Sequence, residues 1–123
     1  PSTHRQQVSK SQLSIFRGSW IADYADAENY LALFYSGNHS PNGPNYTHFS
    51  NTEFDDIYEK SLRIQELAKR IQLYEKMDSI VINHAAIIPL YYDNVLRFSH
   101  KSVNGLGSNA MNLLDLKKVK IIN

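Results

Sequence analysis

The prediction of the fold begins from one segment, Ser14-Ile15-Phe16-Arg17-Gly18-Ser19-Trp20-Ile21-Ala22-Asp23-Tyr24. It starts as an apolar, β-prone run, and it ends with the only tryptophan of the chain, an aspartate and a tyrosine. We predict a strand over residues 12–21, because β-branched and aromatic residues favour strands. Such a strand fixes the backbone while the side chains at its end meet a ligand. The segment therefore predicts one wall of a binding site.

The alternation of side chains along a strand gives this segment two faces. Arg17 and Asp23 share one face and carry opposite charges, so they could hold the two ends of a short zwitterion such as a peptide. Six extended residues span about 20 Å, whereas a tripeptide spans about 10 Å. The strand must therefore bend between the two charges, and Gly18 is the natural place. The alternative interpretation is a core strand with Trp20 packed inside and two solvated charges.

Residues 17–31 resemble the pattern W-x-A-D-Y-x-D-x-E-N-(F/Y)-L of a known protein family. The family is the oligopeptide/dipeptide-binding group (family 5) of extracellular solute-binding proteins, which serve ABC importers. Three later blocks resemble the same family and follow in the same order: residues 45–46 with 50–55, residues 70–77, and residues 86–92. Four blocks in register across most of the chain make the resemblance specific.

The resemblance implies an α/β fold, namely the C-terminal part of a two-lobed periplasmic-binding-protein (type II) fold with helices packed on a mixed sheet. Members of the family are exported and several times longer than 123 residues. We therefore expect the chain to be the C-terminal portion of a longer protein. Residues 1–93 are then part of the C-terminal ligand-binding lobe, and residues 94–123 form crossover and return strands toward the N-terminal lobe. Exposed lobe surface would allow the isolated fragment to self-associate.

Ligand capture without turnover is the function that the resemblance implies, so no enzyme activity and no cofactor are expected. The protein would be the substrate-binding component of an ABC importer that delivers short peptides to permease subunits of the inner membrane. It would lie in the periplasm or be held outside the inner membrane as a lipoprotein.

The resemblance also assigns the candidate ligand-binding residues. Asp23 would pair with the α-ammonium group of a bound peptide, and Trp20 and Ile21 would flank the groove. In some members an arginine at the position of Arg17 meets the peptide carboxylate. The chain would cross toward the other lobe beside the groove at three further residues, Tyr91, Tyr92 and Asp93.

The composition excludes several other classes of function. A net charge of +1 lacks the basic excess that is typical of nucleic-acid binding. Cysteine is absent, so the chain can form neither disulfides nor thiolate metal sites. No apolar run approaches the 18 or so residues of a membrane helix, and no signal peptide is recognisable. None of these features decides the compartment.

Helices and strands beyond the first segment are predicted from caps and periodicity. The polar residues 2–7 could form a short helix before the first strand. Asp26 is the expected N-cap of a helix that runs to Ser36, and Ser50 with Glu53 forms a capping box before a second helix. A further amphipathic helix follows and should end at residues 83–84, with either a soft break or a continuous helix over residues 62–68. Strands are predicted at residues 85–92, 95–99 and 113–122, and a loop at residues 102–112.

Three alternatives to peptide binding remain open. A glycoside hydrolase could use Asp23, Asp26 and Glu28 beside aromatic rings, although the last two are well explained by a helix start. A metal site could use the five histidines, but their spacing fits no compact ligand set: they are His4, His39, His48, His84 and His100. Within the family, other ligands are nickel complexes, haem and oligosaccharides.

Overall fold

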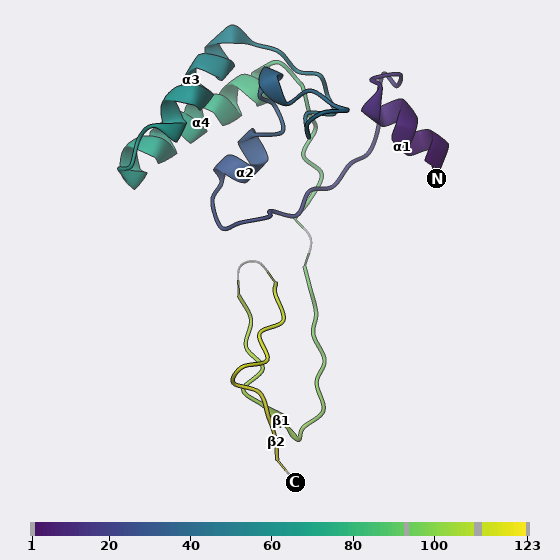
Figure 1. Cartoon of the computed structure of the whole chain (residues 1–123), viewed down its shortest axis with the longest axis vertical. Helices are drawn as coiled ribbons and strands as arrows, with labels where there is room; N and C mark the ends of the chain where they lie inside the picture. The colour runs from purple at the N-terminus through teal and green to yellow at the C-terminus, as the bar shows by residue number, and fades with distance from the viewer. Residues whose placement is uncertain (1, 93, 110–111, 123) are drawn as a thin grey trace.

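The computed structural model describes residues 2–92, 94–109 and 112–122. A body of helices occupies the first two thirds of the chain, and an extended C-terminal arm leads away from it (Figure 1). The described residues of this arm are 87–92, 94–109 and 112–122. The helices are α1 (Ser2–Ser9), α2 (Glu28–Leu31), α3 (Thr52–Leu62) and α4 (Leu67–Asn83), with a 3-10 turn at Ser36–Asn38. The arm carries the strands β1 (Val103–Asn104) and β2 (Lys120–Ile121). No described helix has both the length and the apolar character needed to cross a membrane.

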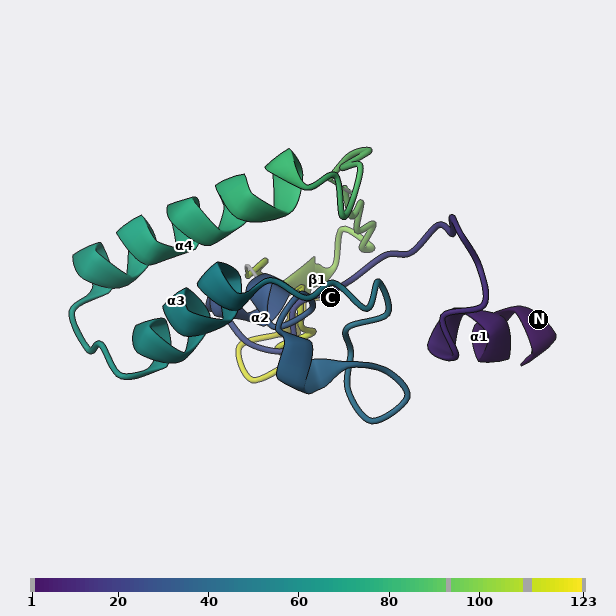
Figure 2. The ribbon, with the colours of Figure 1, turned by 90° about the horizontal axis from the view of Figure 1, so that it is seen from above.

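The core lies between α3 and α4, which run side by side, and α2 (Figures 1 and 2). Phe54 of α3 and Met77 of α4 are fully buried at its centre. The ring of Phe54 meets two further aromatic rings edge to face, those of Phe34 at 6.5 Å and Phe49 at 5.7 Å. Such edge-to-face pairs stabilise a core beyond the area that they bury. This core holds α2 against α3 and α4, and residues 12–24 lead into α2.

The start of α3 differs by one residue from the predicted capping box. The N-cap is Asn51, whose side-chain oxygen accepts a hydrogen bond of 2.9 Å from the backbone amide of Phe54. The prediction of Ser50 as N-cap was therefore wrong, because the next residue is an equally good cap. Glu53 does not reach back to the cap residue. It pairs with Lys76 of α4 at 2.7 Å and so joins the two helices.

The helix predicted from Asp26 to Ser36 is confined to the four residues of α2. Asp26 still accepts a hydrogen bond of 3.0 Å from the backbone amide of Glu28, although the N-cap position itself is Ala27. The chain leaves the helical path further on because Ser36 is bound elsewhere. Its amide and hydroxyl both donate to the Asp55 carboxylate of α3, at 3.1 Å and 2.6 Å.

The helices at the two ends of the body agree better with the sequence. α1 covers the predicted residues 2–7 and continues to Ser9. A break at residues 63–66 separates α3 from α4, so the continuous helix was the wrong one of the two alternatives. α4 ends at Asn83 with His84 as C-cap, as predicted.

The predicted strands form only in part. Within the described residues, the segments 12–21, 85–92 and 95–99 contain no strand. The one ladder is antiparallel and pairs Val103 with Ile121 and Asn104 with Lys120. β1 thus falls in the predicted loop, and β2 covers two residues of the predicted strand 113–122. The described chain is a helix-rich α/β unit with a two-stranded sheet, and no mixed sheet lies under its helices. A strand needs a neighbour to satisfy its backbone amide and carbonyl groups, and these segments have none.

The arm is rich in exposed apolar side chains. Tyr92 is 98% exposed and Phe98 is 91% exposed, and several aliphatic residues share this exposure: Ile88, Leu90, Val95, Leu96, Leu113, Leu114, Leu116 and Ile121. Monomeric proteins rarely expose large apolar patches. This exposure agrees with the expectation of uncovered lobe surface.

Candidate ligand-binding site

The segment that carries the candidate residues runs past α2 as extended, irregular backbone (Figure 1). Its side chains differ in exposure. Arg17 and Asp23 are exposed, Ile21 is 81% exposed, and Trp20 is half-buried. No hydrogen bond or ion pair engages the Asp23 carboxylate within the described part of the chain. The charges at the two ends of the segment are therefore presented to solvent, and the indole between them is anchored.

Asn29 of α2 anchors that indole. Its side-chain oxygen accepts a hydrogen bond of 2.7 Å from the indole nitrogen of Trp20. The same oxygen accepts a second bond of 3.2 Å from the backbone amide of Asp23. Asn29 is itself only 5% exposed. Two candidate site residues are thus held by one buried acceptor.

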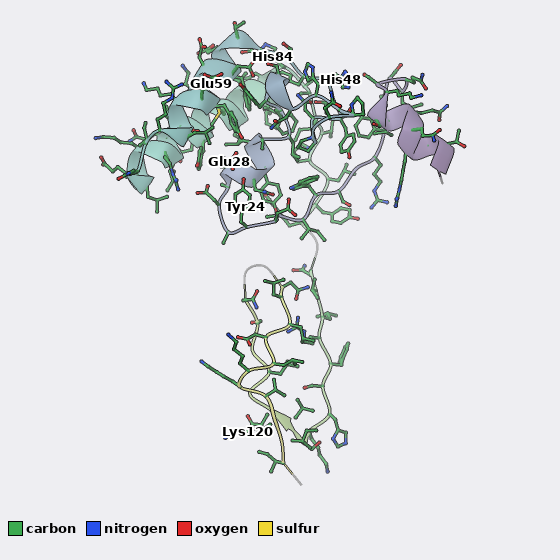
Figure 3. The ribbon with its side chains drawn as sticks, viewed as in Figure 1. Tyr24, Glu28, His48, Glu59, His84 and Lys120 are labelled. Carbon is green, nitrogen blue, oxygen red and sulfur yellow. The ribbon has the colours of Figure 1, made fainter. Side chains whose placement is uncertain are left out.

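The neighbouring residue, Glu28, holds the end of the segment. Its two carboxylate oxygens accept hydrogen bonds from the hydroxyl groups of Tyr24 and Tyr58. Figure 3 labels Glu28 and Tyr24, which lie close together at the lower side of the helical body. Glu28 is 8% exposed, and a buried carboxylate is costly unless hydrogen bonds satisfy it. The hydrogen bond to Glu28 raises the pKa of Tyr24. Burial, followed by its own hydrogen bond to Glu28, raises the pKa of Tyr58. Glu28 therefore joins the segment to α3 through a tyrosine on each side.

Asp26 pairs with Arg70 of α4, with 2.7 Å between the carboxylate oxygen and the guanidinium nitrogen. Both side chains are only about a quarter exposed, at 26% and 28%. The guanidinium lies 6.0 Å from the ring centre of Tyr74. Burial of Tyr74, followed by its interaction with the nearby Asp26 carboxylate, raises the pKa of that phenol to about 12. The ion pair fixes the start of α2 on the helical body.

The three carboxylates that suggested a hydrolase are thus used differently. Asp26 lies in an ion pair and Glu28 in two tyrosine hydrogen bonds, whereas Asp23 faces solvent. A pair of carboxylates that flank a substrate is required for glycoside cleavage. The geometry favours a structural role for two of the three, as their position at a helix start suggested.

Arg17 meets another candidate residue across 74 positions of sequence. Its guanidinium donates a hydrogen bond of 2.6 Å to the hydroxyl oxygen of Tyr91. A hollow of about 240 Å³ is lined by Arg17, Gly18 and Ser19. Tyr92 projects into solvent, and Asp93 lies outside the described residues. The structure therefore brings the predicted arginine and the first predicted tyrosine together beside a polar hollow.

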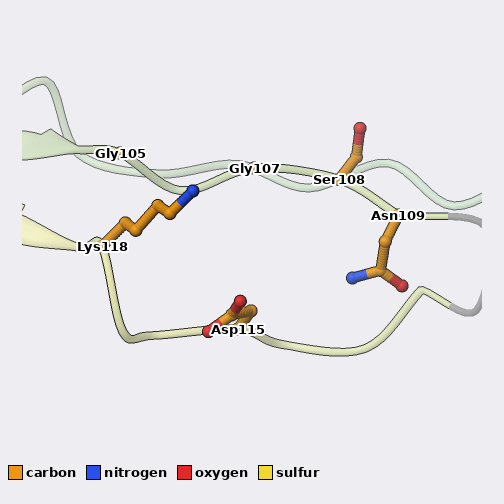
Figure 4. Close-up of a pocket in the computed structure, with 6 residues that line it drawn as sticks. All are labelled: Gly105, Gly107, Ser108, Asn109, Asp115 and Lys118. Atoms are coloured by element: carbon orange, nitrogen blue, oxygen red, sulfur yellow. The ribbon is translucent and has the colours of Figure 1, made fainter.

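A second hollow, of about 190 Å³, lies in the arm (Figure 4). It is lined by six residues, Gly105, Gly107, Ser108, Asn109, Asp115 and Lys118. None of the residues predicted from the sequence lines this hollow, so it stands apart from the candidate site.

The histidines do not form a metal centre. No group of three or more histidine, cysteine or acidic residues able to hold a metal occurs among the described residues. His39 and His48 do stack, with ring centres 5.0 Å apart. Their ring nitrogens are used by the loop itself: His39 contacts the carbonyl oxygen of Phe49 at 3.0 Å, and His48 contacts the hydroxyl of Ser40 at 2.9 Å.

Sequence reasoning missed the residues that hold the site. The sequence placed Glu28 and Asn29 only at the start of a helix, and it predicted no contact for Tyr58 or Arg70. Nothing local distinguishes Glu28 and Asn29 from solvated side chains in the first turn of a helix, because the tyrosine of α3 that binds Glu28 lies 30 residues away. Arg70 had no local signal, since its partner lies 44 residues away.

Comparison with known proteins places the chain among solute-binding proteins. No protein-family model matches the sequence. The chain is 30% identical over 112 residues to the dipeptide-binding protein DppE of Bacillus subtilis (strain 168). The matched region covers 91% of this chain and 20% of that protein. It is 29% identical over 89 residues to the probable deoxycholate-binding periplasmic protein YgiS of Escherichia coli (strain K12), with 72% and 16% covered. It is 30% identical over 78 residues to the periplasmic oligopeptide-binding protein OppA of Escherichia coli (strain K12), with 63% and 14% covered.

The chain spans about a fifth or less of the length of these curated relatives. The similarity covers most of the chain, and the matched proteins include dipeptide- and oligopeptide-binding proteins. The four sequence blocks noted above point to the same group. The chain belongs to the oligopeptide/dipeptide-binding family of extracellular solute-binding proteins.

Proposed function

We propose that the chain is the C-terminal part of the substrate-binding component of an ABC importer, and that the full-length protein captures short peptides between two lobes. In this proposal it binds its ligand without chemical change and delivers it to permease subunits of the inner membrane. Residues 1–93 belong to the C-terminal lobe, and residues 94–123 lead toward the N-terminal lobe. The protein acts in the periplasm or as a lipoprotein outside the inner membrane.

One observation carries this proposal: the Asp23 carboxylate is presented to solvent while its own backbone amide is bound by Asn29. The bond to Asn29 therefore holds the backbone at Asp23 and leaves the Asp23 carboxylate available to a ligand. An ammonium group about 3 Å from the carboxylate would gain roughly 5 kcal/mol of gross attraction at an effective dielectric constant near 20, before desolvation is subtracted. Main-chain hydrogen bonds to the peptide would add affinity with little dependence on its side chains.

Arg17 is the natural partner for the other end of the peptide. Its guanidinium is exposed and is steadied by the hydroxyl of Tyr91. That hydrogen bond uses one of five guanidinium donors, so the others remain able to meet a carboxylate. Trp20, Ile21, Tyr92 and Asp93 complete the proposed ligand-binding set.

Calorimetry on the full-length protein tests the role of Asp23. Trialanine and N-acetyl-trialanine are titrated into the native protein and into an Asp23→Asn variant, with Asp56→Asn, an exposed carboxylate on α3, as the matched control. We expect acetylation and Asp23→Asn each to weaken binding at least tenfold, which is about 1.4 kcal/mol. The acetylated peptide should be insensitive to Asp23→Asn. Equal affinities of the native protein for the two peptides would refute the proposed role.

A non-peptide ligand is the second candidate, because a matched relative is named for deoxycholate binding. A bile acid carries a carboxylate and no amine, so it would engage Arg17 and leave Asp23 unused. Titration with deoxycholate separates the two candidates. Binding of deoxycholate without binding of trialanine would favour this second function.

A further inference from the structure

We propose that Asn29 is the positioning residue of the peptide site, since its single side-chain oxygen sets both the plane of the Trp20 indole and the backbone of Asp23. The inference rests on the proposed function and deepens it. It assigns amine selectivity to a buried amide that would not itself touch the ligand.

The bonding pattern separates this role from ordinary packing. The two donors to Asn29 come from two candidate ligand-binding residues, at 2.7 Å and 3.2 Å. One of them is the Asp23 backbone amide, so the carboxylate of Asp23 is oriented without being neutralised. An amide oxygen has two lone pairs and can accept both bonds at once. A leucine of similar size would fill the same space and accept neither.

The support behind Asn29 is rigid. Its neighbour Glu28 is held by tyrosine hydroxyls from both sides, and Asp26 is held by Arg70. The start of α2 is therefore fixed to α3 through Glu28 and Tyr58 and to α4 through Asp26 and Arg70, and Asn29 is buried next to these two anchors. A binding constellation must be held to within roughly 0.5 Å to discriminate between ligands. A short helix anchored in this way supplies that precision to a segment that has no regular structure of its own.

The test uses the full-length protein and two readouts. The first is the indole N–H resonance of Trp20 and its exchange with solvent, identified by comparison with a Trp20→Phe variant. The second is the ratio of affinities for trialanine and N-acetyl-trialanine, which measures amine selectivity. Asn29→Leu and Asn29→Ala both remove the oxygen, so a folding failure of one leaves the other. Asn29→Asp keeps an oxygen acceptor in place.

Asn45→Leu is the matched control, because Asn45 is a fully buried asparagine whose bonds serve another loop. Its amide donates to the carbonyl oxygens of Tyr35 and Phe49, both at 3.0 Å. Asn45→Leu should lower thermal stability yet leave the indole resonance and the affinity ratio unchanged.

For Asn29→Leu and Asn29→Ala, we expect the indole N–H to exchange at least tenfold faster and the affinity ratio to fall at least fivefold. Asn29→Asp should retain most of both. An unchanged ratio in variants whose indole protection is lost would overturn the positioning role. Native protein that does not distinguish the two peptides would instead overturn the proposed function, and the role of Asn29 with it.

Discussion

The hydroxyl of Tyr58 is expected to support a buried charge, and Tyr58→Phe tests this with little change in shape. Tyr58 is 6% exposed, and its hydroxyl donates to the carboxylate of Glu28, which is 8% exposed. A hydrogen bond to a charged group contributes about 1.5–3 kcal/mol net. Tyr24 still donates to the other carboxylate oxygen in the variant, so the charge is not left without a partner. We expect Tyr58→Phe to lower the free energy of unfolding by about 1.5–3 kcal/mol.

The same substitution in a Glu28→Gln background isolates the part of this energy that comes from charge. A neutral amide oxygen accepts the phenol bond with only about 0.5–1.5 kcal/mol. Tyr58→Phe should therefore cost about 1 kcal/mol less in that background, measured by urea unfolding followed by circular dichroism at pH 7. Tyr35→Phe is the control, because its hydroxyl meets the exposed Glu59 and its loss should barely move the unfolding midpoint. An equal cost of Tyr58→Phe in the two backgrounds would refute the reasoning.

Two further predictions concern the core and its pH dependence. Phe54→Ala should lower the free energy of unfolding by about 3–5 kcal/mol because the side chain is fully buried, whereas Leu67→Ala, at a site 59% exposed, should cost below about 1 kcal/mol in the same urea unfolding assay. The pKa of Tyr74 is raised from 10.0 to about 12, so its stabilisation is complete below pH 10 and is lost as pH rises through 12. The stability advantage of the native chain over Tyr74→Phe should therefore fall by about 1 kcal/mol between pH 9 and 11 in urea titrations, and a constant difference would contradict this.

The helices were largely predictable, because their signals are local. The apolar spacing that includes Tyr74, Met77 and Val81 lies on one face of α4, and those three residues are buried. Helix bonds connect residues four apart, so the sequence of one segment contains all the donors and acceptors that it needs. The errors fall at boundaries. Asn51 replaced its neighbour as a cap, and α2 ended early because Ser36 found Asp55 on another helix.

The strands were predicted poorly because their hydrogen bonds are not local. Residues 12–21 have the composition of a strand, yet nothing in the described chain pairs with them. Strand bonds join different segments, so the composition of one segment does not decide whether a strand forms; that depends on a pairing partner elsewhere in the chain. The same holds for residues 85–92 and 95–99, which have strand composition but no pairing partner in the described chain.

The residues themselves determined the family pattern, the positions of the candidate ligand contacts, and the helical periodicity, because each of these depends on neighbours within a few residues. Only the tertiary structure decided which of the clustered carboxylates is presented to solvent. Asp26 met Arg70 and Glu28 met Tyr58, and both partners come from helices that lie far along the chain. The charge of a carboxylate is fixed by its own residue, whereas its availability to a ligand depends on the groups that folding brings within about 3 Å of it.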